Sequence, residues 1–533
     1  MQLVSTELVG TSIIGQTRAA RGGQTFQGVK ASTGEPLEPV YHAAGSDDLE
    51  RAATLAAAAF PIYREMERQR KAVFLREIAA QIEALGDPLV ERVMAESALP
   101  EARVRGERAR TCFQLRFFAG IVEEGSWVDA RIDTAEPERK PAPKPDMRSM
   151  LRPIGPVAVF CASNFPLAFS VSGGDTASAL AAGCPVIVKA HHSHPGTAEM
   201  VGIAIQQAAA KTAMPEGIFS LLYGAGATIG HGLISHPLIR GGGFTGSRKG
   251  GLELLETARR RPEPIPFYAE MSSINPVFIL PHALAERGPQ IAAGLHGSVT
   301  LGVGQFCTNP GVIVTPAGAA GDEMATALAE RLRATAAASM LNATIFGSYC
   351  WGVERRANDA RVRSLLAGAA SAAHGPSAVT PALFETDAST FLASPELAEE
   401  IFGPESILVR SHDLDEMLAL ARSMEPNLTA TIHMAAGDEE AARQLAAVLE
   451  TRVGRLVYQG YPTGVEVCHA MVHGGPYPST SDGHSTSVGG RAIDRWVRAV
   501  CFQDAPGELL PLELREGNPA GIERIVNGAR GRA

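Results

Sequence analysis

The chain has 533 residues, of which 45% are hydrophobic and 20% charged, with a formal net charge of -9 at pH 7. This length predicts two or three domains with ample core, and the negative charge argues against broad nucleic-acid binding. No apolar run reaches the roughly 18 residues of a membrane span, and residues 1–28 lack the pattern of a secretory signal. The seven scattered cysteines form no Cys-x-x-Cys pair, so we expect reduced thiols and a cytoplasmic location.

The first section of the chain is predicted to be helical. Ser46 is a suitable N-cap for a helix over 47–60, which has acidic residues in its first turn. A second helix is expected over 69–85, because its apolar residues recur on one face. Residues 136–145 are rich in proline and charge, which predicts a connector or an exposed arm.

From residue 157 the pattern alternates between short apolar strands and alanine-rich helices. The expected strands are 157–161, 186–189, 219–223 and 239–244, with helices expected over 175–182, 197–211 and 228–234. This alternation predicts a parallel, doubly wound sheet, whose ligands bind at the carboxyl ends of the strands. A second alternating set contains the strands 312–314, 406–409 and 429–433. The sequence therefore predicts two α/β domains.

Cys307 lies in the turn Gly304-Gln305-Phe306-Cys307-Thr308, between a helical run and a strand. Such a junction exposes a thiol where backbone N–H groups stabilise a thiolate or an adjacent oxyanion. A thiol in this position can attack an aldehyde to give a thiohemiacetal, which becomes a thioester when it loses hydride. A single cysteine is more often an inert buried thiol, so this prediction depends on partners elsewhere in the chain.

Two remote residues are candidate partners for the thiol. Asn164 follows the strand 157–161, and its side-chain NH₂ can donate to the thiohemiacetal oxygen. Glu270 ends the strand-like run 266–270 and can activate the water that hydrolyses a thioester. Each also has a structural interpretation, as a turn asparagine and as a strand-end acid in a salt bridge. The three residues together predict one catalytic site.

Cofactor-binding candidates follow two other strands. Lys189 closes the strand 186–189 and can bond ribose hydroxyls at the edge of the sheet. The loop 244–251 is rich in small residues and opens a helix, which suits a pyrophosphate, although its spacing is not Gly-x-Gly-x-x-Gly. The histidine group His191, His192 and His194 has poor spacing for zinc and no nearby acid or cysteine, so no metal is expected.

Several motifs, in their order and spacing, resemble the NAD(P)-dependent aldehyde dehydrogenase superfamily. They are Ser-Asn-Phe-Pro-Leu, Val-Ile-Val-Lys, Phe-Thr-Gly-Ser, Ala-Glu-Met, Gly-Gln-Phe-Cys-Thr and Glu-Glu-Ile-Phe-Gly-Pro. The resemblance implies an α/β protein with three parts and assembly as a homodimer or homotetramer. The parts are a doubly wound, Rossmann-like cofactor domain (1–135 and 153–272), an α/β catalytic domain (273–470), and a small β oligomerisation arm with a C-terminal segment (136–152 and 471–533).

The resemblance also implies roles for individual residues. It implies Cys307 as the nucleophile, Glu270 as the base and Asn164 in the oxyanion hole. It further implies a set of cofactor contacts: Lys189 and Glu400 on the two riboses, Gly246 and Ser247 near the pyrophosphate, and Phe402 against the nicotinamide. Because relatives that pass the acyl group to coenzyme A lack the glutamate, Glu270 favours hydrolysis to a free acid.

His192 departs from the pattern of many NAD-preferring members, which have a glutamate three residues after the lysine. A carboxylate there would repel a 2′-phosphate, whereas a histidine can donate to it and carry charge. NADP is therefore the expected cofactor, with NAD possible.

The phrases Ala-Ser-Asn-Phe-Pro-Leu-Ala-Phe-Ser and Met-Val-His-Gly-Gly-Pro-Tyr-Pro resemble one branch of the family. This branch contains α-ketoglutaric semialdehyde (2,5-dioxopentanoate) dehydrogenases and an NADP-dependent fatty aldehyde dehydrogenase. The expected substrate is 2,5-dioxopentanoate, which would give 2-oxoglutarate. The alternative is a long-chain fatty aldehyde or a broad range of aldehydes, with Phe165, Phe169 and Phe306 lining an apolar channel.

His473 lies in the second of these phrases, and the resemblance to the fatty aldehyde enzyme places it near the active site. A core or turn histidine is its more ordinary interpretation. An alternative from another class is a cysteine-dependent acyl hydrolase, which needs a histidine within reach of Cys307. A substrate carboxylate would also need a cation, and no arginine is assigned to that role from the sequence.

Overall fold

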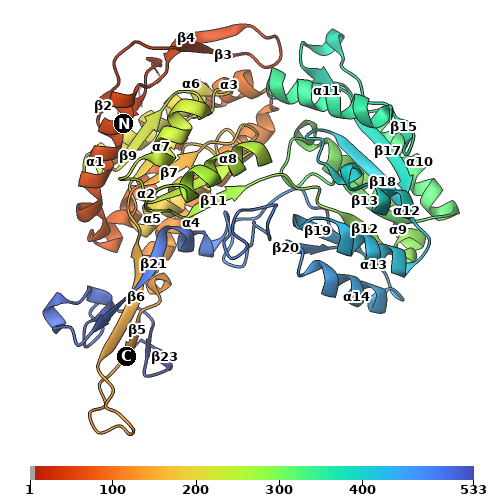
Figure 1. Cartoon of the computed structure of the whole chain (residues 1–533). Coiled ribbons are helices and arrows are strands. Elements are labelled where there is room, and N and C mark those ends of the chain that lie inside the picture. Colours follow the sequence, from red (N-terminus) through yellow and green to blue (C-terminus); the bar gives the residue numbers. More distant parts are fainter. Residues whose placement is uncertain (1–6, 533) are drawn as a thin grey trace.

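A computed structural model describes residues 7–532, which form two α/β units and a β arm (Figure 1). Residues 1–6 and 533, at the outer ends of the expected segments 1–135 and 471–533, lie outside the described residues. In Figure 1 the first unit runs from red to yellow-green, the second unit from green to blue, and the arm projects away from both.

The first unit is built on a seven-stranded sheet with the order β11-β10-β7-β8-β9-β1-β2. Its strands are β1 (Ile13–Ile14), β2 (Thr17–Arg18), β7 (Val157–Phe160), β8 (Val186–Lys189), β9 (Phe219–Leu222), β10 (Gly241–Thr245) and β11 (Phe267–Glu270). Strands β7 to β11 are parallel, and β1 pairs antiparallel with β9 and β2. The chain moves outward from β7 through β8 and β9, then returns to the other side of β7 as β10 and β11. Ligands bind at such a reversal of strand order.

Helices cover this sheet largely where the sequence predicts them. They are α1 (Ser46–Arg64), α2 (Arg68–Ala84), α3 (Gly86–Ser97), α4 (Glu101–Glu124), α5 (Gly174–Ala182), α6 (Pro195–Lys211), α7 (His231–Ser235) and α8 (Arg248–Arg259). The N-cap of α1 is Gly45, so the prediction of Ser46 as the cap is wrong by one residue. The expected helix 228–234 is split into a π-helical turn, Gly226–Gly230, and α7. Helix α4 was not predicted from the sequence, although some of its residues lie beside the candidate active site described below.

The second unit contains another seven-stranded sheet, with the order β15-β17-β18-β13-β12-β19-β20. Its strands are β12 (Val277–Ile279), β13 (Val312–Pro316), β15 (Arg363–Leu366), β17 (Ala382–Asp387), β18 (Glu405–Ser411), β19 (Asn427–His433) and β20 (Val453–Tyr458). Its helices are α9 (Pro281–Thr300), α10 (Ala319–Arg333), α11 (Ala343–Ala357), α12 (Ala388–Ala393), α13 (Leu414–Ser423) and α14 (Glu439–Leu449). All neighbouring strands are parallel except β15 and β17.

Both sheets are buried on both faces, which explains why their strands are apolar without alternation. In β7, Val157 and Val159 pack into one core while Ala158 and Phe160 pack into another. The same holds for the central strand β13 of the second sheet, with separate cores on its two faces. Two α/β units are therefore confirmed. Among residues 7–532, no helix is long and apolar enough to cross a bilayer.

The arm is a five-stranded sheet with the order β21-β6-β5-β22-β23. Its strands are β5 (Arg131–Asp133), β6 (Met147–Pro153), β21 (Val497–Gln503), β22 (Arg524–Val526) and β23 (Ala529–Gly531). Residues 136–145 form the exposed end of the β5–β6 hairpin, as the proline and charge content predicted. Two smaller pairs complete the fold: β3 (Thr25–Val29) with β4 (Pro36–His42), and β14 (Ala338–Ser339) with β16 (Ala378–Val379).

Residues 471–496 leave the second unit and run along the edge of the first sheet before they enter the arm. Ser481 donates its backbone N–H to the carbonyl of Ala269, and Met271 donates to Ser479. An isolated bridge joins Glu270 to Thr480. This segment, which the sequence analysis grouped with the C-terminal part of the chain, therefore lies beside the strand end that carries Glu270.

Candidate active site

A cavity of about 740 Å³ lies at the carboxyl ends of β7, β8, β10 and β11. Residues 399–402 and α11 of the second unit close it from the opposite side. All nine residues expected to act in catalysis or to bind the cofactor line this cavity: Asn164, Lys189, His192, Gly246, Ser247, Glu270, Cys307, Glu400 and Phe402. The structure thus brings together side chains from four strand ends and from two loops of the second unit.

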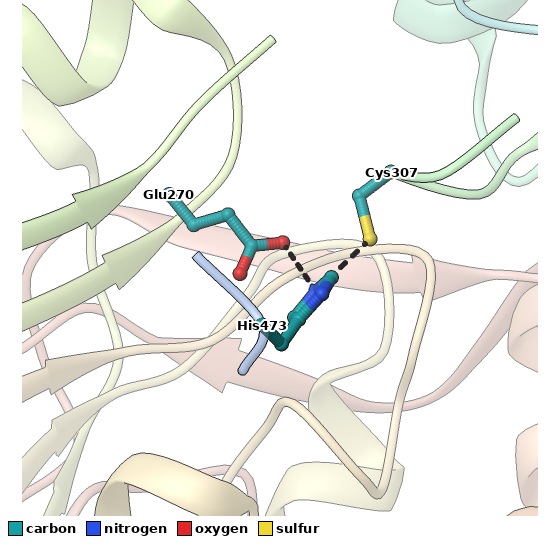
Figure 2. A group of neighbouring side chains, drawn as sticks. All are labelled: Glu270, Cys307 and His473. Carbon is teal, nitrogen blue, oxygen red and sulfur yellow. Dashed lines mark hydrogen bonds and ion pairs between the residues drawn. The ribbon is translucent and has the colours of Figure 1, made fainter. Parts of the chain in front are cut away.

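Three of the side chains beside this cavity meet around one imidazole nitrogen (Figure 2). Nε2 of His473 lies 3.0 Å from Oε1 of Glu270 and 3.5 Å from Sγ of Cys307. His473 and Glu270 are 1% and 2% exposed. His473 therefore bridges the expected base and the expected nucleophile, rather than acting as a turn or core residue without a catalytic neighbour.

Cys307 is held by an unusual turn after α9. Residues Leu301–Gly304 form a 3₁₀ turn in which Gly302, Val303 and Gly304 all have φ near +60° (57°, 59° and 65°). A Cβ at Gly304 would lie 2.3 Å from the backbone carbon of Gly403, so this position requires glycine. The turn ends the helix and directs Cys307 toward the first unit.

The Cys307 loop is also anchored through its carbonyl groups. Nδ2 of Asn275 donates to the carbonyl oxygens of Cys307 and Asn309, each at 2.9 Å. Asn275 is fully buried and has a φ of 45°, which asparagine tolerates better than most residues. Sequence reasoning missed this residue, although its place between the Glu270 motif and Pro276 was a usable signal.

The Glu270 carboxylate accepts hydrogen bonds from several side chains. Besides the contact with His473, Ser487 donates its hydroxyl to Oε2 at 3.0 Å. Burial acts to raise the pKa of Glu270, but the charge of His473 and hydrogen bonds from His473, Ser487 and Cys307 outweigh it and lower the pKa below its usual value. Glu270 is therefore held as a carboxylate. The sequence carried no signal for Ser487, because it lies 217 residues away in the chain.

The pKa of the Cys307 thiol is shifted in the opposite direction. Burial raises the pKa of its thiol well above the usual value, and the neighbouring Glu270 carboxylate raises it further. The thiol is consequently protonated at neutral pH, and it becomes a nucleophile only when a neighbour accepts its proton. The Glu270–His473 pair is placed to do this.

Asn164 follows β7 and faces the Cys307 loop. Its Nδ2 donates to the carbonyl of Gln305 at 3.1 Å, which leaves the second N–H of the amide for another acceptor. The turn that follows is held by Glu107 of α4, which accepts the backbone N–H groups of Leu167 and Ala168 at 2.8 and 2.9 Å. An amide donor is therefore fixed near the thiol.

Lys189 ends β8 and is 9% exposed, and burial lowers its pKa. The rings of His191 and His192 stack at 4.4 Å, and those of His191 and His194 at 5.5 Å. His194 contacts the carbonyl of Ala162 at 2.8 Å. The three imidazole rings therefore form a packed group after the end of β8.

The remaining cofactor candidates lie on both sides of the cavity. Ser247 is the N-cap of α8 and accepts the N–H of Gly250 at 3.3 Å, while the N–H of Gly246 donates to the carbonyl of Glu270 at 3.1 Å. Burial raises the pKa of Glu400 to about 7, against opposing hydrogen bonds from residues 272 and 273. An ideal Cβ at Gly226 meets nothing within 4 Å, so the backbone there borders open space.

The expected substrate-pocket residues form a separate aromatic cluster, which does not line the cofactor cavity. The ring of Phe165 packs edge-on against those of Phe169 and Phe306 at 5.2 and 5.1 Å. The ring of Phe169 lies 6.0 Å from that of His473. Phe306 directly precedes Cys307, so the cluster borders the thiol without lining the cofactor cavity.

Among residues 7–532, one group of side chains has spacing that could hold a metal ion, and it consists of Glu270, Cys307 and His473. Their ligand atoms all lie within 4.8 Å of one another. Nε2 of His473 contacts both other groups, and Cys307 and Glu270 also interact directly. Because Glu270 is a carboxylate, Nε2 donates to it, so the carboxylate rather than the imidazole is the acceptor within reach of the thiol proton.

Comparisons with known proteins identify the family. The profile of the aldehyde dehydrogenase family matches residues 18–495. The chain is 51% identical over 523 residues to alpha-ketoglutaric semialdehyde dehydrogenase 2 of Azospirillum brasilense, covering 98% of this chain and 99% of the relative. It is 44% identical over 520 residues to alpha-ketoglutaric semialdehyde dehydrogenase of Acinetobacter baylyi, covering 97% and 98%.

Solved structures show the same fold. A 3,6-anhydro-L-galactose dehydrogenase in complex with NAP matches with a TM-score of 0.79 at 20% identity, covering 92% of this chain and 99% of that one. An aldehyde dehydrogenase from Bacillus cereus in complex with NAD⁺ matches with a TM-score of 0.78 at 19% identity, covering 92% and 96%. The family resemblance stated from the sequence motifs is confirmed: this chain belongs to the aldehyde dehydrogenase family.

Proposed function

We propose that this protein oxidises 2,5-dioxopentanoate (α-ketoglutaric semialdehyde) to 2-oxoglutarate, with NADP as the hydride acceptor. The observation that carries the reaction is the meeting of the Cys307 thiol and the Glu270 carboxylate at Nε2 of His473. The substrate is supported by the names of the two relatives that match nearly the whole chain.

The residues around the cavity fit a nicotinamide dinucleotide. Lys189 makes no ion pair with any residue from 7 to 532, and a second cavity of about 900 Å³ continues past Lys189, His192 and Gly226. When bound, the nicotinamide accepts hydride from the reacting carbon. Lys189 and His192 would hold the adenosine ribose and its phosphate, and Glu400 and Phe402 would hold the nicotinamide ribose and ring.

The preference for NADP rests on Lys189 and His192 acting together. Burial, followed by the charges of Lys189 and His194, lowers the pKa of His192. His192 is therefore a neutral N–H donor at neutral pH, and Lys189 supplies the positive charge that attracts a 2′-phosphate. This modifies the argument from the sequence, in which the histidine itself carried charge.

The reaction begins when the Glu270–His473 pair accepts the proton of the Cys307 thiol. Sγ then forms a bond to the aldehyde carbon, and the carbonyl oxygen becomes the oxyanion of a thiohemiacetal. The free N–H of Asn164 Nδ2 and the backbone N–H of Cys307 donate to this oxygen. Loss of hydride from the same carbon leaves a thioester on Cys307.

Hydrolysis of the thioester uses the same pair of residues. After the pair has released the thiol proton to solvent, Glu270, supported by His473 and Ser487, accepts a proton from water as the water oxygen attacks the thioester carbon. The carbon–sulfur bond breaks, the sulfur of Cys307 takes back a proton, and the carboxylic acid leaves. Hydrolysis needs Glu270 to accept the proton of water. Loss of Glu270 should therefore impair hydrolysis even where acylation survives.

The test is reduction of the nicotinamide cofactor (NADPH or NADH formation) with 2,5-dioxopentanoate, hexanal and longer aldehydes, each with NADP and with NAD. We expect the highest kcat/KM for 2,5-dioxopentanoate with NADP, and no turnover by Cys307→Ala although it still binds NADP. The substrate assignment fails if 2,5-dioxopentanoate is no better than hexanal. Greater activity with NAD would refute the cofactor assignment.

The contact between His473 and Cys307 also meets the condition stated for a cysteine-dependent acyl hydrolase, because 3.5 Å is within reach for proton transfer from the thiol. The shorter contact of the same nitrogen with Glu270 sets this arrangement apart from a simple Cys–His pair. Ester hydrolysis without aldehyde-dependent NADPH formation would favour the hydrolase.

A further inference from the structure

Arg110 of α4 lies beside the aromatic cluster that borders Cys307. Its guanidinium carbon is 5.9 Å from the centroid of the Phe169 ring. The Phe169 ring lies 6.0 Å from the ring of His473, which contacts the thiol. One terminal nitrogen of Arg110, Nη1, donates to the carbonyl of Val465. The chain therefore holds a cation one aromatic ring away from the catalytic histidine.

The opposite edge of this guanidinium has no partner. Nε and Nη2 of Arg110 are shielded from solvent and donate to no residue between 7 and 532. In the same range, Arg110 forms no ion pair within 4.0 Å. Buried guanidinium donors are normally paired, because removing their water is costly unless another acceptor replaces it. A free buried edge on a guanidinium that also lacks an ion pair therefore indicates an acceptor that arrives with a ligand.

Two carboxylates interact electrostatically with Arg110, and both are engaged elsewhere. Glu107 accepts a hydrogen bond from Nη1 of Arg103 at 2.9 Å, in addition to its two backbone donors. Glu466 accepts the backbone N–H of Val467 at 2.8 Å. Neither carboxylate is bonded to Arg110, so its charge remains available.

Arg455 of β20 adds positive charge beside the same loop, which Arg110 contacts at Val465. Its Nη1 and Nη2 donate to the carbonyls of Gly464 and Pro462 at 2.9 and 2.6 Å, and its Nε is buried without a partner among the described residues. Arg110 and Arg455 both lie within electrostatic range of Cys307. Two guanidinium charges therefore lie near the thiol, and that of Arg110 lies against the aromatic cluster.

We propose that the Nε–Nη2 edge of Arg110 binds the carboxylate of the substrate while its aldehyde carbon is held at Sγ of Cys307. A guanidinium edge binds a carboxylate through two parallel N–H···O bonds. Arg110 then selects aldehydes with a carboxylate at the far end over uncharged aldehydes. This inference rests on the proposed function and deepens it by naming the residue that recognises the acid end of the substrate.

Arg103 provides a matched control on the same helix. Its guanidinium lies 4.5 Å from the ring centroid of Phe165 and 5.2 Å from that of Phe306. It too has a buried, unpaired Nε–Nη2 edge, but its charge is compensated by the ion pair with Glu107. Arg110 lacks such a partner, so the two residues differ in the charge that remains for a ligand.

The experiment measures Arg110→Gln and Arg103→Gln with 2,5-dioxopentanoate, succinate semialdehyde and hexanal. For Arg110→Gln we expect KM to rise on the order of 10- to 100-fold for the two carboxylate-bearing aldehydes, with kcat/KM for hexanal retained. For Arg103→Gln the ratio between charged and uncharged aldehydes should stay the same. Equal losses on charged and uncharged aldehydes by Arg110→Gln, or an equal shift of the ratio by Arg103→Gln, would overturn the inference.

Binding of glutarate separates this inference from the proposed function. In the Cys307→Ala background, calorimetry should detect glutarate binding that Arg110→Gln weakens on the order of tenfold or more. That result supports the role of Arg110 even where 2,5-dioxopentanoate proves not to be the preferred aldehyde. Absence of glutarate binding, or binding that does not depend on Arg110, contradicts it.

Discussion

Two buried glutamates, Glu107 of α4 and Glu270 of β11, show how the surroundings of a carboxylate determine its use. Each is 2% exposed. Glu107 accepts two backbone N–H groups and an ion pair from Arg103, all fixed donors that cannot exchange a proton with a ligand. Glu270 borders the cofactor cavity and instead shares one imidazole nitrogen with the Cys307 thiol.

The two carboxylates are equally buried, and they differ in the groups that donate hydrogen bonds to them. Backbone amides and a guanidinium stay protonated at any physiological pH, so a carboxylate bound to them is a structural anchor. An imidazole can gain or lose its proton, so a carboxylate bound to it takes part in proton transfer. Glu107 is therefore expected to act on stability and Glu270 on turnover.

The largest expected effect is that of Glu270→Gln. The amide keeps the shape of the side chain but cannot accept a proton, so kcat should fall on the order of 10²- to 10⁴-fold. Steady-state and single-turnover kinetics should show an initial burst of NADPH if acylation survives, because hydrolysis is then the slower step. A Tm close to that of the wild type is expected, and a large loss of Tm would remove the contrast with Glu107.

Glu107→Gln should show the reverse pattern. Breaking a buried pair leaves Arg103 uncompensated and costs about 3 kcal/mol, so Tm should fall. Thermal unfolding followed beside kcat measures both properties. A fall in kcat as large as that of Glu270→Gln, at an unchanged Tm, would place Glu107 in the catalytic machinery instead.

His192→Glu places a carboxylate in the cofactor cavity within electrostatic range of Lys189. Repulsion of the 2′-phosphate should shift the preference from NADP toward NAD on the order of 10- to 100-fold in the ratio of kcat/KM values. The control is His192→Gln, which removes the ring without adding charge and should shift the ratio less. An equal shift in both variants would show that the charge is irrelevant.

Glu400 is a third buried glutamate. Burial outweighs the hydrogen bonds that its carboxyl accepts and raises its pKa to about 7. The folded state then holds a proton that the unfolded state releases at lower pH. The stabilising contribution of the neutral acid is present at low pH and is lost as the pH rises through about 7. The Tm of Glu400→Gln relative to wild type should therefore be higher at pH 8 than at pH 5, and a constant difference would contradict the raised pKa.

Motifs at the strand ends made the cofactor side of the site predictable. Each residue there follows a recognisable strand, and in a parallel sheet the carboxyl ends of the strands meet at one edge. Asn164, Lys189, Ser247 and Glu270 all came from that rule and all line one cavity. On the aldehyde side the three phenylalanines were predicted but Arg110 was not, because α4 carries charged residues on several faces and gave no clear helical pattern.

The sequence by itself determined the two α/β units, the family and the residues at the edge of the first sheet, since periodicity and local motifs act over short stretches of chain. Only the tertiary structure decided that His473, 166 residues after Cys307 and 203 after Glu270, joins these two groups. It alone also decided that Arg110 keeps an unpaired edge beside the aromatic cluster. Contacts between such distant residues depend on how the C-terminal segment packs along β11, and no local preference of the chain encodes that packing.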